Sequence, residues 1–393
     1  MPLIRSKIGL IVLVVCCTNP GAAQSRTPLE RQLATDIQDF RLDDFSHIEA
    51  AFILSGATHP DSLAYYLQWY QKLLDVLNNY HLDRFDRVGS AGKVFAYLHE
   101  TWLKTYEEKA TTLLNVVKEK QFNCVAGTIL FNLICEDLGW QTEAFETPTH
   151  TYTIFPNFTD KPIMIENTTP MGFNIMQNLK EYSRYLLQFY PENRAAKIGF
   201  DRLHEHEMSQ GRKIDNTELL GLLAYNRAYL AVEEFDYQSG YDFVLLAQEF
   251  NKDSRSNVNF EIDLYYRWGK KLFDEKRYQQ AFRVFIDAYQ RYWEYDDFLK
   301  NSKAAFFNAL AENWNDKNWS KSDQLFQEIF ELDIIEEKDM ARMETILLNW
   351  GHYLHRKKRS TQVDKVFGYL RSLNPDNSRL EAFENYINSQ NNR

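Results

Sequence analysis

Apolar residues recur at helical spacing through most of the first half of the chain. The pattern predicts a helix over 62–78, one or two more over 91–118, a strongly apolar helix over 122–138 and another over 178–190. The apolar run of the third segment stops at Gly139. The first half is therefore expected to be mainly helical.

The pattern changes after Gly139. Three short segments, 142–145, 149–156 and 163–166, are rich in Thr, Ile, Phe and Tyr and are separated by residues typical of turns. Such segments predict strands of a small antiparallel sheet. We therefore expect an α+β fold for the first half.

A polar stretch without sustained periodicity separates the two halves. We assign 28–200 to the first domain and 201–214 to a linker, with the domain boundary near Gly211. The remainder, 215–390, is expected to be an all-α domain.

The second half repeats itself at 41-residue intervals. Four triplets share one phase of the repeat: Asn226-Arg227-Ala228, Arg267-Trp268-Gly269, Asn308-Ala309-Leu310 and Asn349-Trp350-Gly351. Each unit reads as two amphipathic helices that cannot bury their apolar faces alone. Four such units are expected to stack into a solenoid.

The second unit resembles a tetratricopeptide repeat. It carries small and large residues at that family's spacing, namely Trp268-Gly269, Leu272, Tyr278, Ala281, Phe285 and Ala288. The period of 41 residues departs from the roughly 34 of the family, so each unit has a longer helix or loop. The resemblance implies a concave surface for docking a protein partner; the alternative is that the repeats only buttress the first domain.

The N-terminus has the three parts of a secretory signal peptide. Arg5 and Lys7 precede an apolar run of ten residues, and Gly21-Ala22-Ala23 offers a cleavage site, so 1–23 is expected to be removed on export. Lipidation at Cys16 is the alternative. The expected location is periplasmic or extracellular. No later segment has the apolar length of a transmembrane helix, so the mature chain is expected to lack one.

The formal net charge is −10, from 45 Lys and Arg against 55 Asp and Glu. A field of that sign repels a phosphate backbone. Nucleic acid is therefore not an expected partner.

Two cysteines remain after the signal segment. Cys124 and Cys135 lie 11 residues apart in the predicted helix 122–138, which separates them by about 16 Å. A disulfide needs a much shorter separation. Cys135 sits among apolar neighbours and reads as core, whereas Cys124 opens the helix.

Three residue types suited to nucleophilic chemistry fall at the ends of predicted elements. Cys124 follows Asn123, a good N-cap, and the positive end of the helix dipole favours a thiolate. His150 begins one predicted strand, and Glu166 ends the next. A thiolate nucleophile, an imidazole that carries the proton and a carboxylate that orients the imidazole make a triad.

The stretch 122–174 resembles the transglutaminase-like superfamily, which has a papain-type fold. The matching segments are FNCVAGTILFNLICEDLGW, PTHTYTIF and IMIENTTPMGFN. In that family a Cys at a helix start, a His that opens a strand and an Asp on the neighbouring strand form the triad. Cys124 and His150 match directly, and Glu166 falls at the position of the Asp. Asn167 is the alternative third member, because papain-like enzymes use Asn.

The expected reaction is acyl transfer to Cys124 from an amide of a protein or peptide. Hydrolysis, as by a peptidase or amidase, is favoured over cross-linking to an amine. The backbone N–H of Cys124 is the first candidate to stabilise the oxyanion, and Gln121 is a weaker one. The reaction needs neither a cofactor nor a metal. The alternative function is an inactive scaffold of the same fold that binds a partner through its repeats.

Two groups of histidines are set aside as metal sites. The run 204–207, His-Glu-His-Glu, lacks the one-face spacing of zinc-binding helices and reads as part of the solvated linker. His352 and His355 share a helix face but have no obvious third ligand nearby.

Overall fold

The structure is a computed structural model that describes residues 26–83, 85–147, 149–156, 162–175, 179–187, 197–199, 202–375 and 378–391. The expected signal segment 1–23, with Cys16, lies outside these residues. The fold is mostly helical, with a small antiparallel sheet and a helical C-terminal region. This agrees with the prediction of an α+β first half and an all-α second half. The chain divides into two compact units, one that ends at Leu264 and one that begins at Tyr265.

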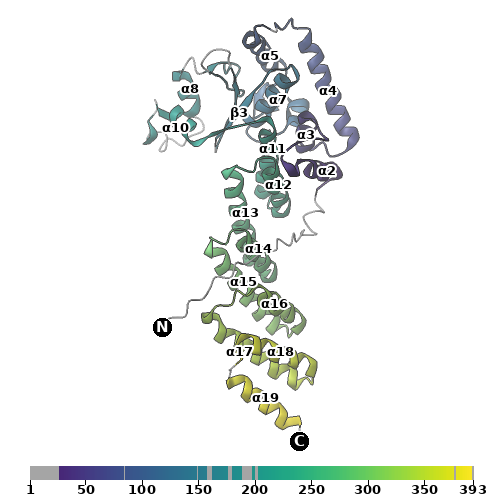
Figure 1. Cartoon of the computed structure of the whole chain (residues 1–393), viewed down its shortest axis with the longest axis vertical. Coiled ribbons are helices and arrows are strands. Elements are labelled where there is room, and N and C mark those ends of the chain that lie inside the picture. The colour runs from purple at the N-terminus through teal and green to yellow at the C-terminus, as the bar shows by residue number, and fades with distance from the viewer. Residues whose placement is uncertain are drawn as a thin grey trace. The chain divides into compact units, whose positions relative to one another are not determined.

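The first unit begins with a group of helices, shown in purple and blue in Figure 1. They are α2 (Pro28–Asp36), the short 3-10 helix η1 (Ile37–Asp39), α3 (His47–Leu54), α4 (Pro60–Asn78), α5 (Arg87–Thr101), α6 (Leu113–Glu119) and α7 (Cys124–Asp137). The helix predicted over 62–78 is α4, which starts two residues earlier because His59 caps it and Pro60 suits the first turn. The segment 91–118 divides into α5 and α6, with β1 (Thr105–Tyr106) between them.

The main sheet has four strands in the order β5-β4-β3-β6, all antiparallel. The strands are β3 (Glu143–Glu146), β4 (Thr151–Phe155), β5 (Ile163–Ile165) and β6 (Arg212–Ile214). The first three correspond to the predicted strands. β1 forms a separate parallel pair with β2 (Gln121–Phe122).

The segment 201–214, expected to be a linker, has regular structure in its described part. It contains α10 (Leu203–Gln210) and the edge strand β6. β6 pairs with β3, and two cross-strand ion pairs, Lys213–Glu143 at 2.8 Å and Arg212–Glu146 at 3.2 Å, hold it there. Its short polar sequence gains strand structure from this pairing rather than from its own periodicity.

Helix α7 is the centre of the first unit. Its residues 125–135 are all buried, because α7 packs against α3, α5, α6 and α11 and against strands β3 and β4. A helix covered on every side needs apolar residues all round. A second core cluster joins β3 and β4 to α8 (Leu179–Leu186) and α10 through Phe145, Tyr152, Met164, Tyr182, Leu186 and Leu203.

The first repeat belongs to the first unit. Its helices are α11 (Asn216–Glu233) and α12 (Tyr237–Phe250), and α11 packs against both α7 and α3. The compact unit ends within α13 (Arg255–Asp274), at Leu264. The expected boundary near Gly211 therefore does not coincide with the division between the compact units.

The second unit continues as helix pairs. After α13 come α14 (Tyr278–Arg291), α15 (Asp296–Asn315), α16 (Trp319–Leu332), α17 (Glu337–Arg356), α18 (Ser360–Leu373) and α19 (Ser378–Asn391). Where the helices of a pair approach, small residues are required. A Cβ on Gly269 would lie 2.5 Å from the ring of Phe285.

The 41-residue period is present in the backbone itself. The turn between the two helices of each pair contains one left-handed residue, and these are Phe235, Lys276, Lys317 and Lys358. Their φ angles lie between 54° and 63°. The turns thus repeat at the interval seen in the sequence.

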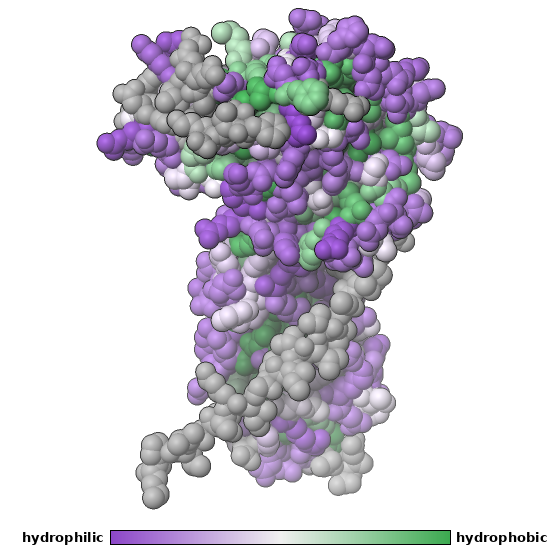
Figure 2. Space-filling view, turned by 45° about the horizontal axis from the view of Figure 1, so that its top comes forward, coloured by the Kyte–Doolittle hydropathy of each residue, from purple (hydrophilic) through white to green (hydrophobic). Residues whose placement is uncertain are grey.

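Charged and polar residues dominate the visible surface, and hydrophobic residues form only small separate areas on it (Figure 2). Large apolar side chains with high exposure include Phe85, Met171 and Trp293. Within the described part of the chain, no helix combines the length and apolarity that a membrane span requires.

Candidate functional site

Cys124 is the first residue of α7. Asn123 has extended backbone, and its side-chain oxygen accepts a hydrogen bond from the N–H of Ala126 at 3.0 Å, so it caps the helix as predicted. The Asn123 amide also donates to the carbonyl of Glu108 at 3.3 Å. The cap therefore fixes where the helix begins and where the thiol lies.

The two cysteines have different surroundings. Both are free thiols, and Cys124 is half-buried, whereas Cys135 is completely buried. Burial raises the pKa of Cys135 well above its ordinary value, because an apolar site disfavours the thiolate. Only Cys124 combines solvent access with the positive end of a helix.

His150 lies just before β4 and directs its ring toward Glu166. The imidazole Nε2 is 2.7 Å from Glu166 Oε2, and neither side chain is exposed to solvent. Cys124 is close enough to His150 to contribute to the pKa of the imidazole. Since Glu166 bonds to Nε2, a proton exchanged with the thiol would pass through Nδ1.

The charge state of His150 follows from these neighbours. Burial lowers the pKa of His150, but the charge of Glu166, the hydrogen bond with Glu166 and the neighbouring Cys124 together outweigh it. The net effect raises the pKa of His150 well above its ordinary value. The site therefore favours an imidazolium beside the sulfur at neutral pH.

Glu166 is held by the turn that follows β5. Its Oε1 accepts hydrogen bonds from the N–H of Thr168 at 3.1 Å and from its hydroxyl at 2.7 Å. The backbone N–H of Glu166 donates to the carbonyl of Gly172 at 3.0 Å. This close return of the chain requires glycine, since a Cβ at position 172 would lie 1.8 Å from the carbonyl oxygen of Glu166.

Asn167, the alternative third member, lies in a different buried network. Its side-chain amide donates to the hydroxyls of Thr153 at 2.9 Å and Thr128 at 3.2 Å. Thr153 in turn donates to Asn132 at 2.5 Å. Glu166, rather than Asn167, makes the bond to His150 Nε2.

Gln121 lies in β2, three residues before Cys124, and is half-buried. Its backbone pairs with Thr105 of β1. The structure thus places Gln121 on the strand that leads into α7, close in sequence to the thiol but outside the helix.

Tyrosines surround the site, and the sequence did not point to them. The ring of Tyr185 lies 6.1 Å from that of His150, and its hydroxyl bonds to the hydroxyl of Thr168. Burial and the nearby charge of Glu166 raise the pKa of Tyr185. Burial and the neighbouring Cys124 and Glu108 raise the pKa of Tyr106 in the same way. Both phenols are therefore neutral at neutral pH. Both tyrosines lie outside the sequence segment that contains the triad, so nothing in the sequence pointed to them.

The histidines set aside above as metal ligands lie on α10 and on α17. The ring of His352 lies 4.2 Å from that of Phe383, in the C-terminal helices. His206 lies on α10, while the side chain of His204 is outside the described part. Over the described ranges, no group of three His, Cys, Asp or Glu side chains is arranged to hold a metal ion.

The site brings together one half-exposed thiol, one buried imidazole and one buried carboxylate, in that order. Such a chain can deprotonate the thiol and return its proton to a leaving group. Models of known protein families, curated proteins and solved structures contain no match to this chain. The geometry of these three side chains is thus the basis for assigning a function.

Proposed function

We propose that the protein is a transglutaminase-like cysteine hydrolase that cleaves amide bonds in a protein or peptide. One observation carries the proposal: the buried imidazole of His150 bonds to Glu166 at 2.7 Å, and Cys124, at the start of α7, is close enough to raise the pKa of the same ring. A structural histidine in an apolar core has no need of a reactive group on each side.

Each residue has a role in the proposed reaction. The Cys124 thiolate attacks the amide carbonyl carbon and forms a C–S bond. As the tetrahedral intermediate collapses, the C–N bond breaks and the imidazolium of His150 donates its proton to the departing amine. Glu166 holds the ring and stabilises its positive charge. The product of this half-reaction is a thioester on Cys124 and a free amine.

Water completes the cycle. His150, now neutral, takes a proton from water, whose oxygen attacks the thioester carbonyl. The C–S bond breaks, the acid product leaves, and Cys124 regains its thiolate beside the imidazolium. An amine in place of water would give a cross-link. The half-exposed position of Cys124 favours water as the acceptor.

The oxyanion needs N–H donors beside the attacked carbonyl. The N–H groups in the first turn of a helix have no acceptor within that helix, so the backbone N–H of Cys124 suits the role. Gln121 is the second candidate, since β2 leads directly to the start of α7.

The papain-type fold is part of the proposal. Its support is the order of the elements: a helix that begins at the Cys and packs on an antiparallel sheet, whose adjacent strands β4 and β5 carry the His and the acid at their ends. Export through the segment 1–23, or a lipid anchor at Cys16, remains our proposal for location.

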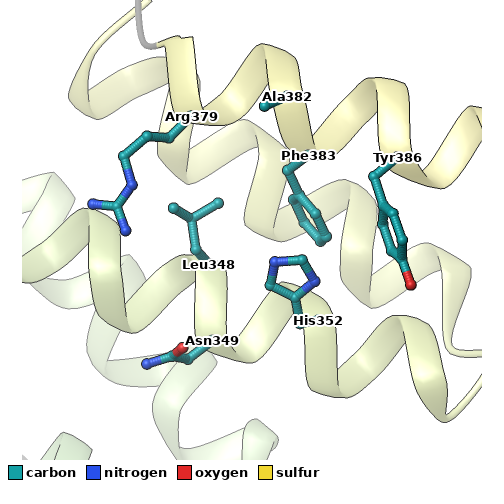
Figure 3. A pocket seen from close by; sticks show the side chains of 7 residues that line it. All are labelled: Leu348, Asn349, His352, Arg379, Ala382, Phe383 and Tyr386. Atoms are coloured by element: carbon teal, nitrogen blue, oxygen red, sulfur yellow. The ribbon is translucent and has the colours of Figure 1, made fainter.

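Binding of a protein partner by tetratricopeptide-like repeats is the second candidate function. A hollow of about 430 Å³ lies between α17 and α19, lined by apolar side chains that include Leu348 and Phe383 (Figure 3). Asn349, His352 and Arg379 bring polar atoms to its wall. A hollow with both kinds of surface suits a peptide segment.

The test of the first proposal is the rate at which iodoacetamide alkylates Cys124 as a function of pH. An ion pair with His150 gives a high rate already at about pH 6, and His150→Ala removes this plateau. Cys135, buried in the same helix, is the internal control and stays unmodified in the folded protein. A wild-type rate that rises only at about pH 8–9, as for an ordinary thiol, would refute the hydrolase and favour the binding role.

A further inference from the structure

A hydrogen-bonded chain holds the turn that carries His150. The hydroxyl of Thr147 lies 2.7 Å from Glu207 Oε1, to which it donates, and it accepts the backbone N–H of His150 at 3.0 Å. The N–H of Thr147 donates to the carbonyl of His150 at 2.8 Å. Glu207 is thus connected through one hydroxyl to the backbone of His150.

Glu207 reaches this turn from a distant part of the sequence. It lies on α10, 60 residues beyond Thr147, in the segment predicted from the sequence to be a solvated linker. Its exposure is only 2%. A buried carboxylate is costly unless hydrogen bonds satisfy it, so its bond to Thr147 is part of what holds it there.

The next residue of α10 contacts the strand that follows the turn. The hydroxyl of Tyr152, on β4, donates to the sulfur of Met208 at 2.8 Å. α10 therefore contacts the chain on both sides of His150, through Glu207 before it and Met208 after it.

We propose that Glu207 and Thr147 are positioning residues that orient His150 toward both Cys124 and Glu166. The inference rests on the proposed hydrolase function and extends it to residues that touch neither substrate nor thiol. The bond to Glu166 fixes one edge of the imidazole, and the turn fixes the backbone from which the ring projects. With both fixed, the direction of the other edge of the ring, which carries Nδ1, is fixed as well.

Four substitutions test the chain of bonds. Thr147→Val keeps the shape of the side chain and removes the hydroxyl, and Thr147→Ser restores it. Glu207→Ala removes the carboxylate, and Glu207→Gln keeps an acceptor oxygen. Glu205→Gln is the matched control, because Glu205 is an exposed acid on the same helix.

The first readout is the pH profile of Cys124 alkylation. Thr147→Val and Glu207→Ala should lower the rate at about pH 6 roughly 10- to 100-fold, since small misplacements of a catalytic group have effects of that size. Thr147→Ser and Glu205→Gln should stay within about twofold of the wild type, and Glu207→Gln should fall between the two groups. Circular dichroism monitors folding. If Thr147→Val and Glu207→Ala do not fold, the alkylation rates of Glu207→Gln and Glu205→Gln at about pH 6 are compared instead, and a slower rate in Glu207→Gln supports the positioning role.

The second readout does not depend on thiol chemistry. The proton between His150 Nε2 and Glu166 should give a downfield NMR signal, which Thr147→Val and Glu207→Ala abolish or shift and Thr147→Ser preserves. If the wild-type thiol is unreactive near pH 6 but this signal responds as stated, the hydrolase proposal fails and the positioning role stands. Folded Thr147→Val or Glu207→Ala with an unchanged pH profile and an unchanged signal would overturn the positioning role. Equal pH profiles of alkylation for Glu207→Gln and Glu205→Gln would also overturn the positioning role.

Discussion

The imidazole of His47 lies between Glu136 and Thr217, with Nδ1 2.7 Å from the carboxylate of Glu136 and Nε2 2.9 Å from the hydroxyl of Thr217. It thereby joins α3, α7 and α11. The other carboxylate oxygen of Glu136 accepts a bond from Asn216 at 2.7 Å. One histidine thus connects the helix that begins with Cys124 to the first repeat.

This connection predicts a pH dependence of stability. The hydrogen bond with Glu136 raises the pKa of His47 above its ordinary value, despite burial. Burial raises the pKa of Glu136, but the bonds with His47 and Asn216 outweigh it and lower the pKa overall. The contribution of His47 is complete below about pH 6.5 and is lost as the pH rises through the raised value. The contribution of Glu136 is present above about pH 4.3 and is lost as the pH falls through the lowered value.

The measurement is urea unfolding of the wild type and His47→Gln across this pH range. The wild type should be more stable by at most about 1 kcal/mol between about pH 4.5 and 6.5, because the pair is partly exposed, and the difference should shrink at alkaline pH. A difference that grows with rising pH would contradict the assigned charge states.

Replacing Glu166 tests the carboxylate of the proposed triad. Glu166→Gln removes the charge that raises the pKa of His150, so the thiolate–imidazolium pair should be lost at about pH 6. Any amidase activity should fall roughly 10²- to 10⁴-fold, as for other triads whose acid is replaced. The matched variant Asn167→Ala should leave the pH profile of alkylation unchanged, since Asn167 bonds to Thr128 and Thr153 instead. A larger effect at Asn167 than at Glu166 would reverse the assignment.

Substitutions at the helix cap Asn123 separate the effect of a charge near Cys124 from the effect of losing the cap. Asn123→Ala removes the bond to the N–H of Ala126 and should cost about 1 kcal/mol of stability. Asn123→Asp keeps a cap but puts a carboxylate next to Cys124, where it opposes the thiolate. The stability of Asn123→Asp should therefore stay close to that of the wild type, while its alkylation at about pH 6 slows. Equal alkylation rates in the two proteins would show that the start of α7 has no influence on the thiol.

Gly172 should tolerate no side chain. A Cβ there would meet the carbonyl of Glu166 at 1.8 Å, so Gly172→Ala must displace the turn that holds the carboxylate. The expected loss is roughly 2–4 kcal/mol, measured by thermal or urea unfolding, together with a weaker low-pH alkylation plateau. Gly368→Ala is the control. Nothing lies within 4 Å of its added Cβ, and alanine should stabilise that helix by about 0.5–1 kcal/mol.

The sequence predicted the elements whose signals are local. Asn123 before an apolar run predicts the start of α7, and alternation with turn residues predicts the strands next to His150 and Glu166. β6 has three residues and no periodicity, so its strand structure depends on its partner β3. Even the pair closest in sequence, Glu146 with Arg212, is 66 residues apart. Pairings of that kind cannot be read from one segment.

The expected boundary near Gly211 differs from the division between the compact units for a related reason. The 41-residue period includes α11, yet residues 219–224, LLGLLA, are six buried residues in succession. One amphipathic face cannot account for such a run, so the run itself indicated a helix covered from more than one side. Glu207 gave no signal, because an acid in a polar run reads the same whether it faces water or a buried hydroxyl.

The first repeat is therefore not interchangeable with the others. α11 covers α7 and α3, and its first residues bond to Glu136 and His47. A gene rearrangement that deleted or exchanged this repeat would expose the helix that carries Cys124. Relatives of different length should therefore all retain the helix pair that follows β6.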